Sequence, residues 1–270
     1  YQKFGQDKVA STKDYSVLSG FATNYNKFEI FSGQNTIITE SLRYDSYNNF
    51  NNALTGKIGA KQFVYSDFYI SGNFGTGYNA PTLYQLNNVL NTNPNLEPEK
   101  SLTSDITFGN EMISITGFYS EVTDLFAYEN AIYDDDWNVL EAGYYYQSKG
   151  TSKTKGIEIN YEDYFFDSLG VNAMYTYVKA KDSNGNEIAR LPKEQVDVRA
   201  TYYVSEGFDL GLNAQYIGTR YDKADKQGAQ TGEYAVVNFV SNVKVNNSVT
   251  VYGKINNISD EYYQTVDGYA

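Results

Sequence analysis

The sequence predicts an all-β fold: a transmembrane, antiparallel, up-and-down β-barrel to which this chain contributes about thirteen strands. Three observations support it. Apolar and polar residues alternate along almost the whole chain, the connections between alternating segments are short and long in turn, and 28 of the 270 residues are tyrosine. Tyrosine combines an apolar ring with a hydrated hydroxyl group, which suits the boundary between lipid and water. No apolar run reaches the roughly 18 residues that a membrane-spanning helix needs.

The alternating segments are typical of strands with one apolar and one polar face. The clearest begins at Leu169, where every second residue up to Tyr177 is apolar and most residues between are small or polar. We predict further strands over residues 68–74, 157–161, 196–202, 208–216, 235–239 and 249–255. Most of the alternating segments are near the 9 to 11 residues, roughly, that a tilted strand needs to cross a bilayer.

The connections differ in length in a regular way. Short ones have the composition of hairpin turns and lie at 109–111, 205–207 and 245–247. Long ones cover 79–101, 127–141, 181–194, 219–232 and the residues after Ile258. Alternate connections of a meander lie at the same end, so we expect the long loops to gather at one end, as they do outside the cell in outer-membrane barrels.

A soluble β-sandwich or a lipocalin-like barrel shares the period of two and is the alternative fold. Neither requires this alternation of connection lengths, and an open soluble sheet of such a size would expose its edges. Bacterial single-chain barrels have an even number of strands. The odd number predicted here, with no closing strand before Ala270, leads us to expect that residues 1–270 form a barrel domain that is incomplete at both ends.

Composition excludes several functions. The chain carries 21 Lys and Arg against 33 Asp and Glu, a formal net charge of −12, which argues against nucleic-acid binding. It has no cysteine for disulfides or thiolate metal sites. It also has no histidine, the usual general base and the commonest zinc ligand. We therefore predict no catalytic residues and no enzyme activity.

Two acidic runs resemble weak calcium sites, because carboxylate and amide oxygens suit that ion. Asp134–Asp136 fits a solvated acidic loop better. Asp182, Asn184 and Asn186 have calcium-like spacing, but Asn184–Gly185 is a strong signal for a tight turn. We predict no metal site and no cofactor, with calcium in these loops as the weaker alternative.

Two segments in the first half carry a family resemblance. The run from Phe74 to Leu86, with Gly75-Thr76-Gly77-Tyr78 and Ala80-Pro81, is followed by Asn93-Pro94-Asn95-Leu96-Glu97-Pro98 up to Ser101. This pair resembles the signature of TonB-dependent outer-membrane receptors. Three later segments resemble the cobalamin receptors of that family: Gln215–Lys223, Gly253–Tyr263 and Thr265–Tyr269. The resemblance extends from about Phe68 to the last residue and is weaker before it.

The resemblance implies a barrel of about 22 strands filled by an N-terminal plug, with the plug and the last strand outside this chain. It also implies a location in the outer membrane of a Gram-negative bacterium, in contact with its lipid. The expected function is uptake of cobalamin or a related corrinoid, driven by the TonB–ExbB–ExbD complex acting on the absent N-terminal part. The alternatives are a ferric-siderophore or haem receptor of the same family, or a passive porin or surface adhesin without a plug.

Candidate binding residues follow only where motifs match. Cobalamin receptors use an arginine in the long loop before a strand reading Lys-Gln-Gln-Val; here Lys193-Glu194-Gln195-Val196 follows Arg190. They also use the tyrosine of a Gly-Tyr pair in the last loop, which is Tyr269 here. Arginine offers several donors to carbonyl and phosphate groups, and tyrosine adds apolar area with one hydroxyl group. A plain loop charge and an aromatic-belt anchor are the respective alternatives.

The loop with Tyr221, Asp222 and Asp225 is a further, weaker candidate for facing the ligand.

Overall fold

The computed structural model describes residues 2–4, 14–31, 33–87, 93–129, 131–134 and 138–268. These residues form one sheet of thirteen strands in sequence order, omitting β8 and β9. Its strands are β1 (Gln2–Phe4), β2 (Tyr15–Phe31), β3 (Gln34–Tyr47), β4 (Ala53–Tyr65), β5 (Phe68–Asn79), β6 (Glu99–Gly109), β7 (Ile113–Glu129), β10 (Tyr144–Phe165), β11 (Leu169–Lys181), β12 (Glu194–Ser205), β13 (Phe208–Ile217), β14 (Tyr234–Lys244) and β15 (Thr250–Ile255). A separate hairpin pairs β8 (Ile132–Tyr133) with β9 (Val139–Glu141), and the helices are α1 (Leu83–Asn87) and the 3₁₀ helix η1 (Ala224–Lys226).

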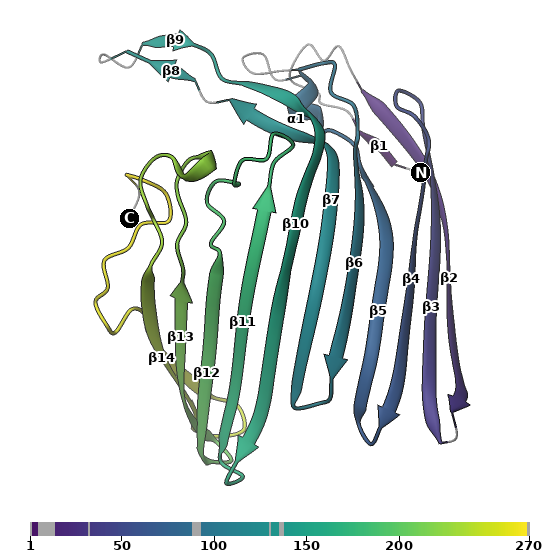
Figure 1. Cartoon of the computed structure of the whole chain (residues 1–270). Coiled ribbons are helices and arrows are strands. Elements are labelled where there is room, and N and C mark those ends of the chain that lie inside the picture. The colour runs from purple at the N-terminus through teal and green to yellow at the C-terminus, as the bar shows by residue number, and fades with distance from the viewer. Residues whose placement is uncertain are drawn as a thin grey trace.

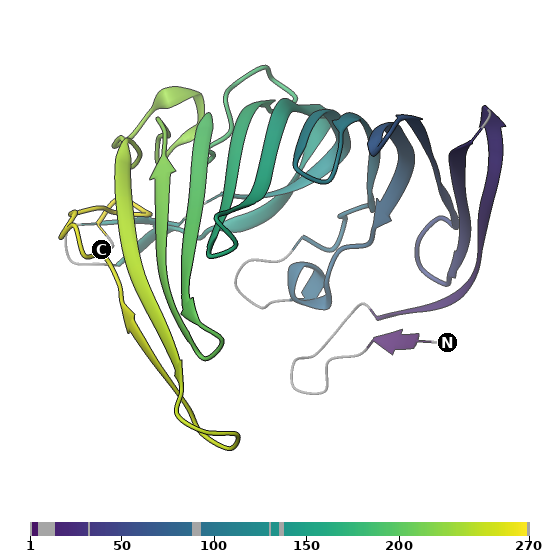
Figure 2. The same ribbon diagram turned by 90° about the horizontal axis from the view of Figure 1, so that it is seen from below.

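Every strand of the large sheet runs antiparallel to its neighbours, which confirms the predicted up-and-down meander. The sheet curves into an open arc, with α1 and β1 on its concave side (Figure 2). Short turns gather at the lower end of Figure 1 and long connections at the upper end. We call these the short-turn end and the long-connection end. The latter includes residues 80–98, 182–193, 218–233 and 256–268.

The convex face carries the predicted apolar series. Residues directly opposite each other on neighbouring strands share a face, and the register joins one apolar row across seven strands: Ile70, Phe108, Ile115, Ile159, Tyr175, Val196 and Tyr216. We call this row the apolar belt. Several members are well exposed, for example Phe108 at 50%. Such exposure fits a face that lies against lipid rather than a protein core.

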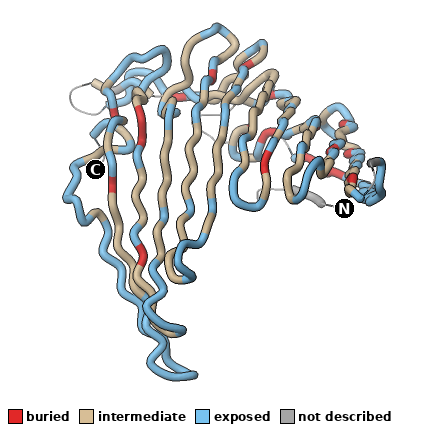
Figure 3. Tube along the Cα trace, turned by 60° about the horizontal axis from the view of Figure 1, so that its bottom comes forward, coloured by how far each residue is buried: buried red, intermediate tan, exposed pale blue. Residues whose placement is uncertain are grey.

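The concave face is polar. The same register joins Glu162, Asn172, Arg199, Asn213 and Asn238 across β10 to β14. Buried residues are few along the described chain (Figure 3). One cluster joins Tyr15, Leu86 and Leu96 on the concave side, with Tyr47 and Phe50 packed against it. A wall of one sheet has no second layer to bury, so burial is concentrated where a connection folds back onto it.

Two sequence predictions need correction in detail. The connection 127–141 is not all loop, because β7 continues to Glu129 and β8 pairs with β9. Strand β10 begins at Tyr144, ahead of the predicted start at 157, because β7 supplies a ladder partner for its polar first half. No helix of the described segments is long and apolar enough to cross a membrane.

Candidate functional site

Three segments distant in sequence meet at the long-connection end: residues 182–193, 218–233 and 256–268. Arg190 links the first two. Its backbone N–H donates to the carbonyl oxygen of Tyr221 at 2.8 Å, and its Nε donates to Oδ1 of Asp222 at 2.8 Å. The φ angle of Arg190 is +60°, a left-handed conformation that is uncommon outside glycine. The structure thus places three residues that were predicted separately, Arg190, Tyr221 and Asp222, next to one another.

Asp222 is the more enclosed partner of this pair. Its side chain is 13% exposed, whereas that of Arg190 is 49% exposed. The hydrogen bond from Arg190 holds the pKa of Asp222 below its usual range despite partial burial, and a hydrogen bond from the backbone of Asp267 acts in the same direction. Asp267 belongs to the third segment, so one carboxylate connects all three.

Asp225 contacts the first segment through its backbone N–H group. Its N–H donates to the carbonyl oxygen of Glu187 at 2.9 Å, and its side chain is exposed in η1. The Glu187 carboxylate lies 3.4 Å from Nζ of Lys193 and 3.7 Å from Nζ of Lys226. These contacts tie residues 182–193 to residues 218–233 a second time, and they leave the Asp225 carboxylate facing solvent.

Arg220 is a residue of this site that the sequence did not single out. Its Nη2 lies 3.4 Å from both the Tyr234 hydroxyl and the carbonyl oxygen of Gln264, and its guanidinium carbon lies 5.8 Å from the Tyr234 ring centre. Tyr234 stacks on Tyr263 with centroids 4.6 Å apart. The Arg220 Nε atom is buried and has no hydrogen-bond partner among the described residues. Arg220 therefore anchors the last segment against β14.

The predicted contact Tyr269 lies outside the described residues. The described parts of the two acidic runs make local hydrogen bonds. Oxygens of Asp182 accept hydrogen bonds from the backbone of Asn184 and Asn186, as in a tight turn, and Asp134 accepts from Asn138. Asp135 and Asp136 also lie outside the described residues. Within them, no group of three or more Asp or Glu side chains is placed to hold a metal ion.

The segment 80–98 is a second feature that sequence reasoning had treated only as a loop. Its described parts fold onto the concave face, where Leu86 and Leu96 are 2% and 1% exposed. Gln147 fixes Glu97 from both sides: Oε1 accepts from its N–H at 3.0 Å, and Nε2 donates to its carbonyl oxygen at 2.6 Å. Tyr84 meets Tyr145 edge-on beside this segment. Tyr84 and Tyr145 thus form an aromatic contact between this segment and β10.

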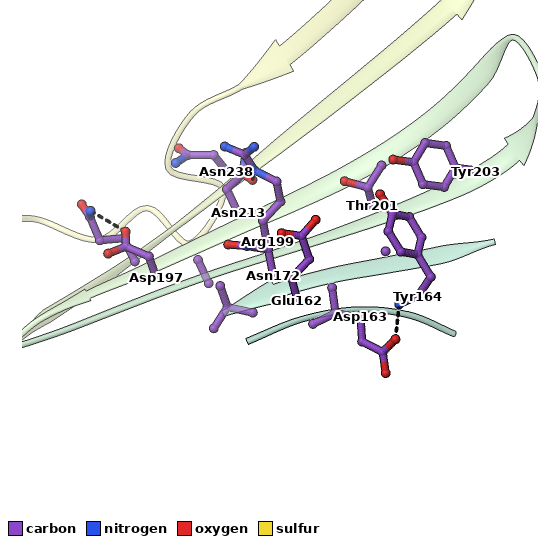
Figure 4. Close-up of a pocket in the computed structure, with 15 residues that line it drawn as sticks. Glu162, Asp163, Tyr164, Asn172, Asp197, Arg199, Thr201, Tyr203, Asn213 and Asn238 are labelled. Atoms are coloured by element: carbon purple, nitrogen blue, oxygen red, sulfur yellow. Dashed lines mark hydrogen bonds between the residues drawn. The ribbon is translucent and has the colours of Figure 1, made fainter. Parts of the chain in front are cut away.

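A polar cavity of about 600 Å³ lies on the concave face near the short-turn end (Figure 4). Its lining includes Glu162, Arg199 and Asn213, and Arg199 Nε donates to Asn213 Oδ1 at 3.0 Å. Asp197 accepts from Gln215 at 2.8 Å. Because these side chains belong to the polar row of the sheet, the cavity is part of the interior surface of the arc rather than of the converging loops.

The comparisons with known proteins agree with this architecture. A family model described as "TonB dependent receptor-like, beta-barrel" matches residues 4–258. Among solved structures, the ferric enterobactin receptor PfeA of Pseudomonas aeruginosa has 15% identity and a TM-score of 0.72, over 92% of this chain and 40% of that one.

Two further solved structures are similar. The siderophore receptor PirA of Acinetobacter baumannii has 14% identity and a TM-score of 0.72, over 94% of this chain and 43% of its own. The copper transporter OprC has 14% identity and a TM-score of 0.70, over 93% and 43%. The chain thus spans less than half the length of each solved structure, and at these identities the likeness shows the fold.

Proposed function

This chain belongs to the TonB-dependent receptor family, and on that basis we propose that it forms part of a receptor that takes up a bulky organic metal complex, specifically a corrinoid such as cobalamin. Barrels of this family lie in the outer membrane of Gram-negative bacteria. The apolar belt on the convex face and the polar concave face agree with that location.

The observation that carries the proposal is the convergence of three segments around Arg190. Asp222 uses the Nε donor, while the half-exposed guanidinium keeps further N–H groups for a ligand. A corrinoid presents amide carbonyls and a phosphodiester, both of which accept such hydrogen bonds. Held by Tyr221, Asp222 and its own left-handed backbone, Arg190 would meet the ligand in a fixed orientation, which lowers the entropic cost of binding.

Charge supports a corrinoid over an anionic iron chelate. The segments 182–193, 218–233 and 256–268 together contain five basic and eight acidic residues. The net negative charge of these three segments repels a multiply anionic ferric catecholate. A near-neutral corrinoid meets no such repulsion.

A ferric siderophore is the second candidate, favoured by the likeness to PfeA and PirA and by the aromatic pair Tyr84 and Tyr145 at the long-connection end. The likeness to OprC makes a copper ion without an organic carrier another candidate ligand. This chain contains no His or Cys and two Met, so its own residues offer few of the ligands that copper prefers. Haem is the other candidate ligand for a receptor of this family.

The proposed energy source is the TonB–ExbB–ExbD complex, acting through parts of the receptor outside these residues. The proposal is tested by measuring binding of cyanocobalamin and of ferric enterobactin to the full-length receptor in detergent. Tight binding of cyanocobalamin alone is the expected result. Binding of ferric enterobactin alone would replace the ligand but keep the receptor, and binding of neither would overturn both ligand assignments while leaving the family in place.

A further inference from the structure

Four lysines form two like-charged pairs on the convex face. The register sets Lys155 directly opposite Lys179, and Lys153 directly opposite Lys181, on the neighbouring strands β10 and β11. All four are exposed. In a chain with a net charge of −12, such a concentration of positive charge on one face is unexpected.

The lysines lie just beyond the apolar belt, toward the long-connection end. On β11 the convex-face series is apolar from Leu169 to Tyr177 and then changes to Lys179 and Lys181. The distance along the strand from Leu169 to Lys179 is roughly 33 Å, or about 23 Å of height for a strand tilted by about 45°. That height matches an apolar band of about 25 Å, so the lysines reach the headgroup level of the outer leaflet.

Two carboxylates on the same face, Glu121 and Glu194, balance at most half of the charge of the four lysines. Glu121 lies 3.5 Å from Nζ of Lys153 and also accepts a hydrogen bond from Tyr119. In the part of the chain that the structure describes, Lys155, Lys179 and Lys181 form no ion pair. Like charges directly opposite each other destabilise a sheet. An anionic partner placed between them would remove that cost.

An apolar groove of about 720 Å³ adjoins the two inner lysines. Its lining includes Ile106, Gly117, Ile157 and Tyr177, together with Lys155 and Lys179. The groove exists because Gly117 has no side chain: a Cβ atom there would have only Ile106 Cγ2 near it, at 4.0 Å. Apolar walls below and ammonium groups above match a lipid with an acyl chain and a phosphorylated headgroup.

We propose that this groove and the Lys155–Lys179 pair bind a phosphorylated lipid of the outer leaflet, namely the lipid A part of lipopolysaccharide. One acyl chain lies over Gly117 between Ile106 and Ile157, and a phosphate group accepts hydrogen bonds from Lys155 and Lys179. Charge complementarity and continuity with the apolar belt carry the assignment. The site faces the membrane, so it is independent of the ligand that the receptor transports.

The test is a titration of the delipidated full-length receptor in detergent with bisphosphorylated lipid A, followed by native mass spectrometry. K155Q/K179Q is expected to weaken binding by about thirtyfold, from the contribution of two lysines near a charged lipid surface. G117L fills the groove, keeps every charge and is also expected to weaken binding. Lipid A without phosphates is expected to bind the wild-type receptor as weakly as bisphosphorylated lipid A binds K155Q/K179Q.

The matched control is K57Q/K254Q, which removes two exposed lysines from the concave face. It is expected to bind lipid A like the wild type, and the heat-modifiable shift of the folded band in gel electrophoresis confirms that each variant is folded. The proposal is overturned if K155Q/K179Q binds as tightly as the wild type, if the control loses as much affinity, or if phosphatidylglycerol binds the wild type as tightly as lipid A.

Discussion

The Nε atom of Arg190 donates a hydrogen bond of 2.8 Å to Oδ1 of Asp222, a residue in the next long connection. The pair joins the β11–β12 connection to the β13–β14 connection, and Asp267 adds the segment after β15 through its backbone. Asp222 therefore fixes the position of Arg190, while Arg190 remains the more exposed of the two.

Replacing Arg190 should weaken ligand binding. In the full-length receptor, we expect R190A to lower corrinoid affinity by about 10- to 100-fold, because a charge-assisted hydrogen bond is lost. D222N keeps the size of the side chain but removes its charge, so a smaller loss is expected. Titration with cyanocobalamin measures both. R199A, which removes an arginine from the polar cavity near the short-turn end, is the control, and unchanged affinity in R190A would contradict the assignment.

The link between Arg190 and Asp222 should depend on pH. The pKa of Asp222 in the folded protein lies below its ordinary value of 3.8 because Arg190 stabilises the carboxylate. The stabilisation is therefore complete above the ordinary pKa and is lost as the pH falls through the lowered pKa.

We expect protection of the Arg190 N–H against hydrogen exchange, corrected for intrinsic rates, to fall as the pH drops below 3.8 and through the lowered pKa of Asp222. In D222N that fall should be absent. The same fall in D222N and in the wild type would show that another group controls the connection.

Tyr263 should hold the segment 256–268 in place. Its ring stacks on Tyr234, next to Arg220. We expect Y263A to cost about 0.5–1.5 kcal/mol beyond the lost buried area, and to speed amide hydrogen exchange in residues 259–267. Y262A is the matched control, since Tyr262 is 76% exposed. Equal effects of both variants would mean that the stack does not anchor the segment.

Gly156 should not tolerate a side chain. A Cβ atom there would overlap the carbonyl oxygen of Tyr177 and would lie 2.5 Å from Cζ of Phe118. We expect G156A to destabilise the barrel by about 1–3 kcal/mol, as overpacking does. The urea midpoint, read from the heat-modifiable shift of the folded band in gel electrophoresis, measures this. G20A provides the comparison because nothing lies within 4 Å of the corresponding Cβ atom.

Much of the fold could be predicted because the side-chain period of a strand is two. The series from Leu169 to Tyr177 is apolar at every second residue, and the structure places it on the convex face with Val196 and Tyr216. The composition of residues 205–207 and 245–247 likewise marked the short turns. The alternation of polarity along a strand and the residue types of a turn are sufficient to predict strands and short turns.

The limits of the strands were less predictable at the long-connection end. The first half of β10 is polar, and its partners in β7 hold it in the sheet through backbone hydrogen bonds that do not depend on side-chain polarity. The inward course of residues 80–98 was also missed. Leu96 is an ordinary loop leucine in the sequence, and only its packing with Tyr15 and Leu86 reveals its role.

The sequence by itself determined the antiparallel meander, its two faces and the gathering of the long connections at one end. The faces follow from the alternation of polarity along each strand, and the gathering follows from the alternation of short and long connections. It also named Arg190 as a candidate by motif resemblance, and Tyr221 and Asp222 separately as members of a candidate loop. Only the tertiary structure decided that Arg190 is bonded to Asp222, that Arg220 holds the last segment, and that four lysines form two facing pairs. Contacts between distant segments depend on strand register and loop packing, which no local pattern specifies.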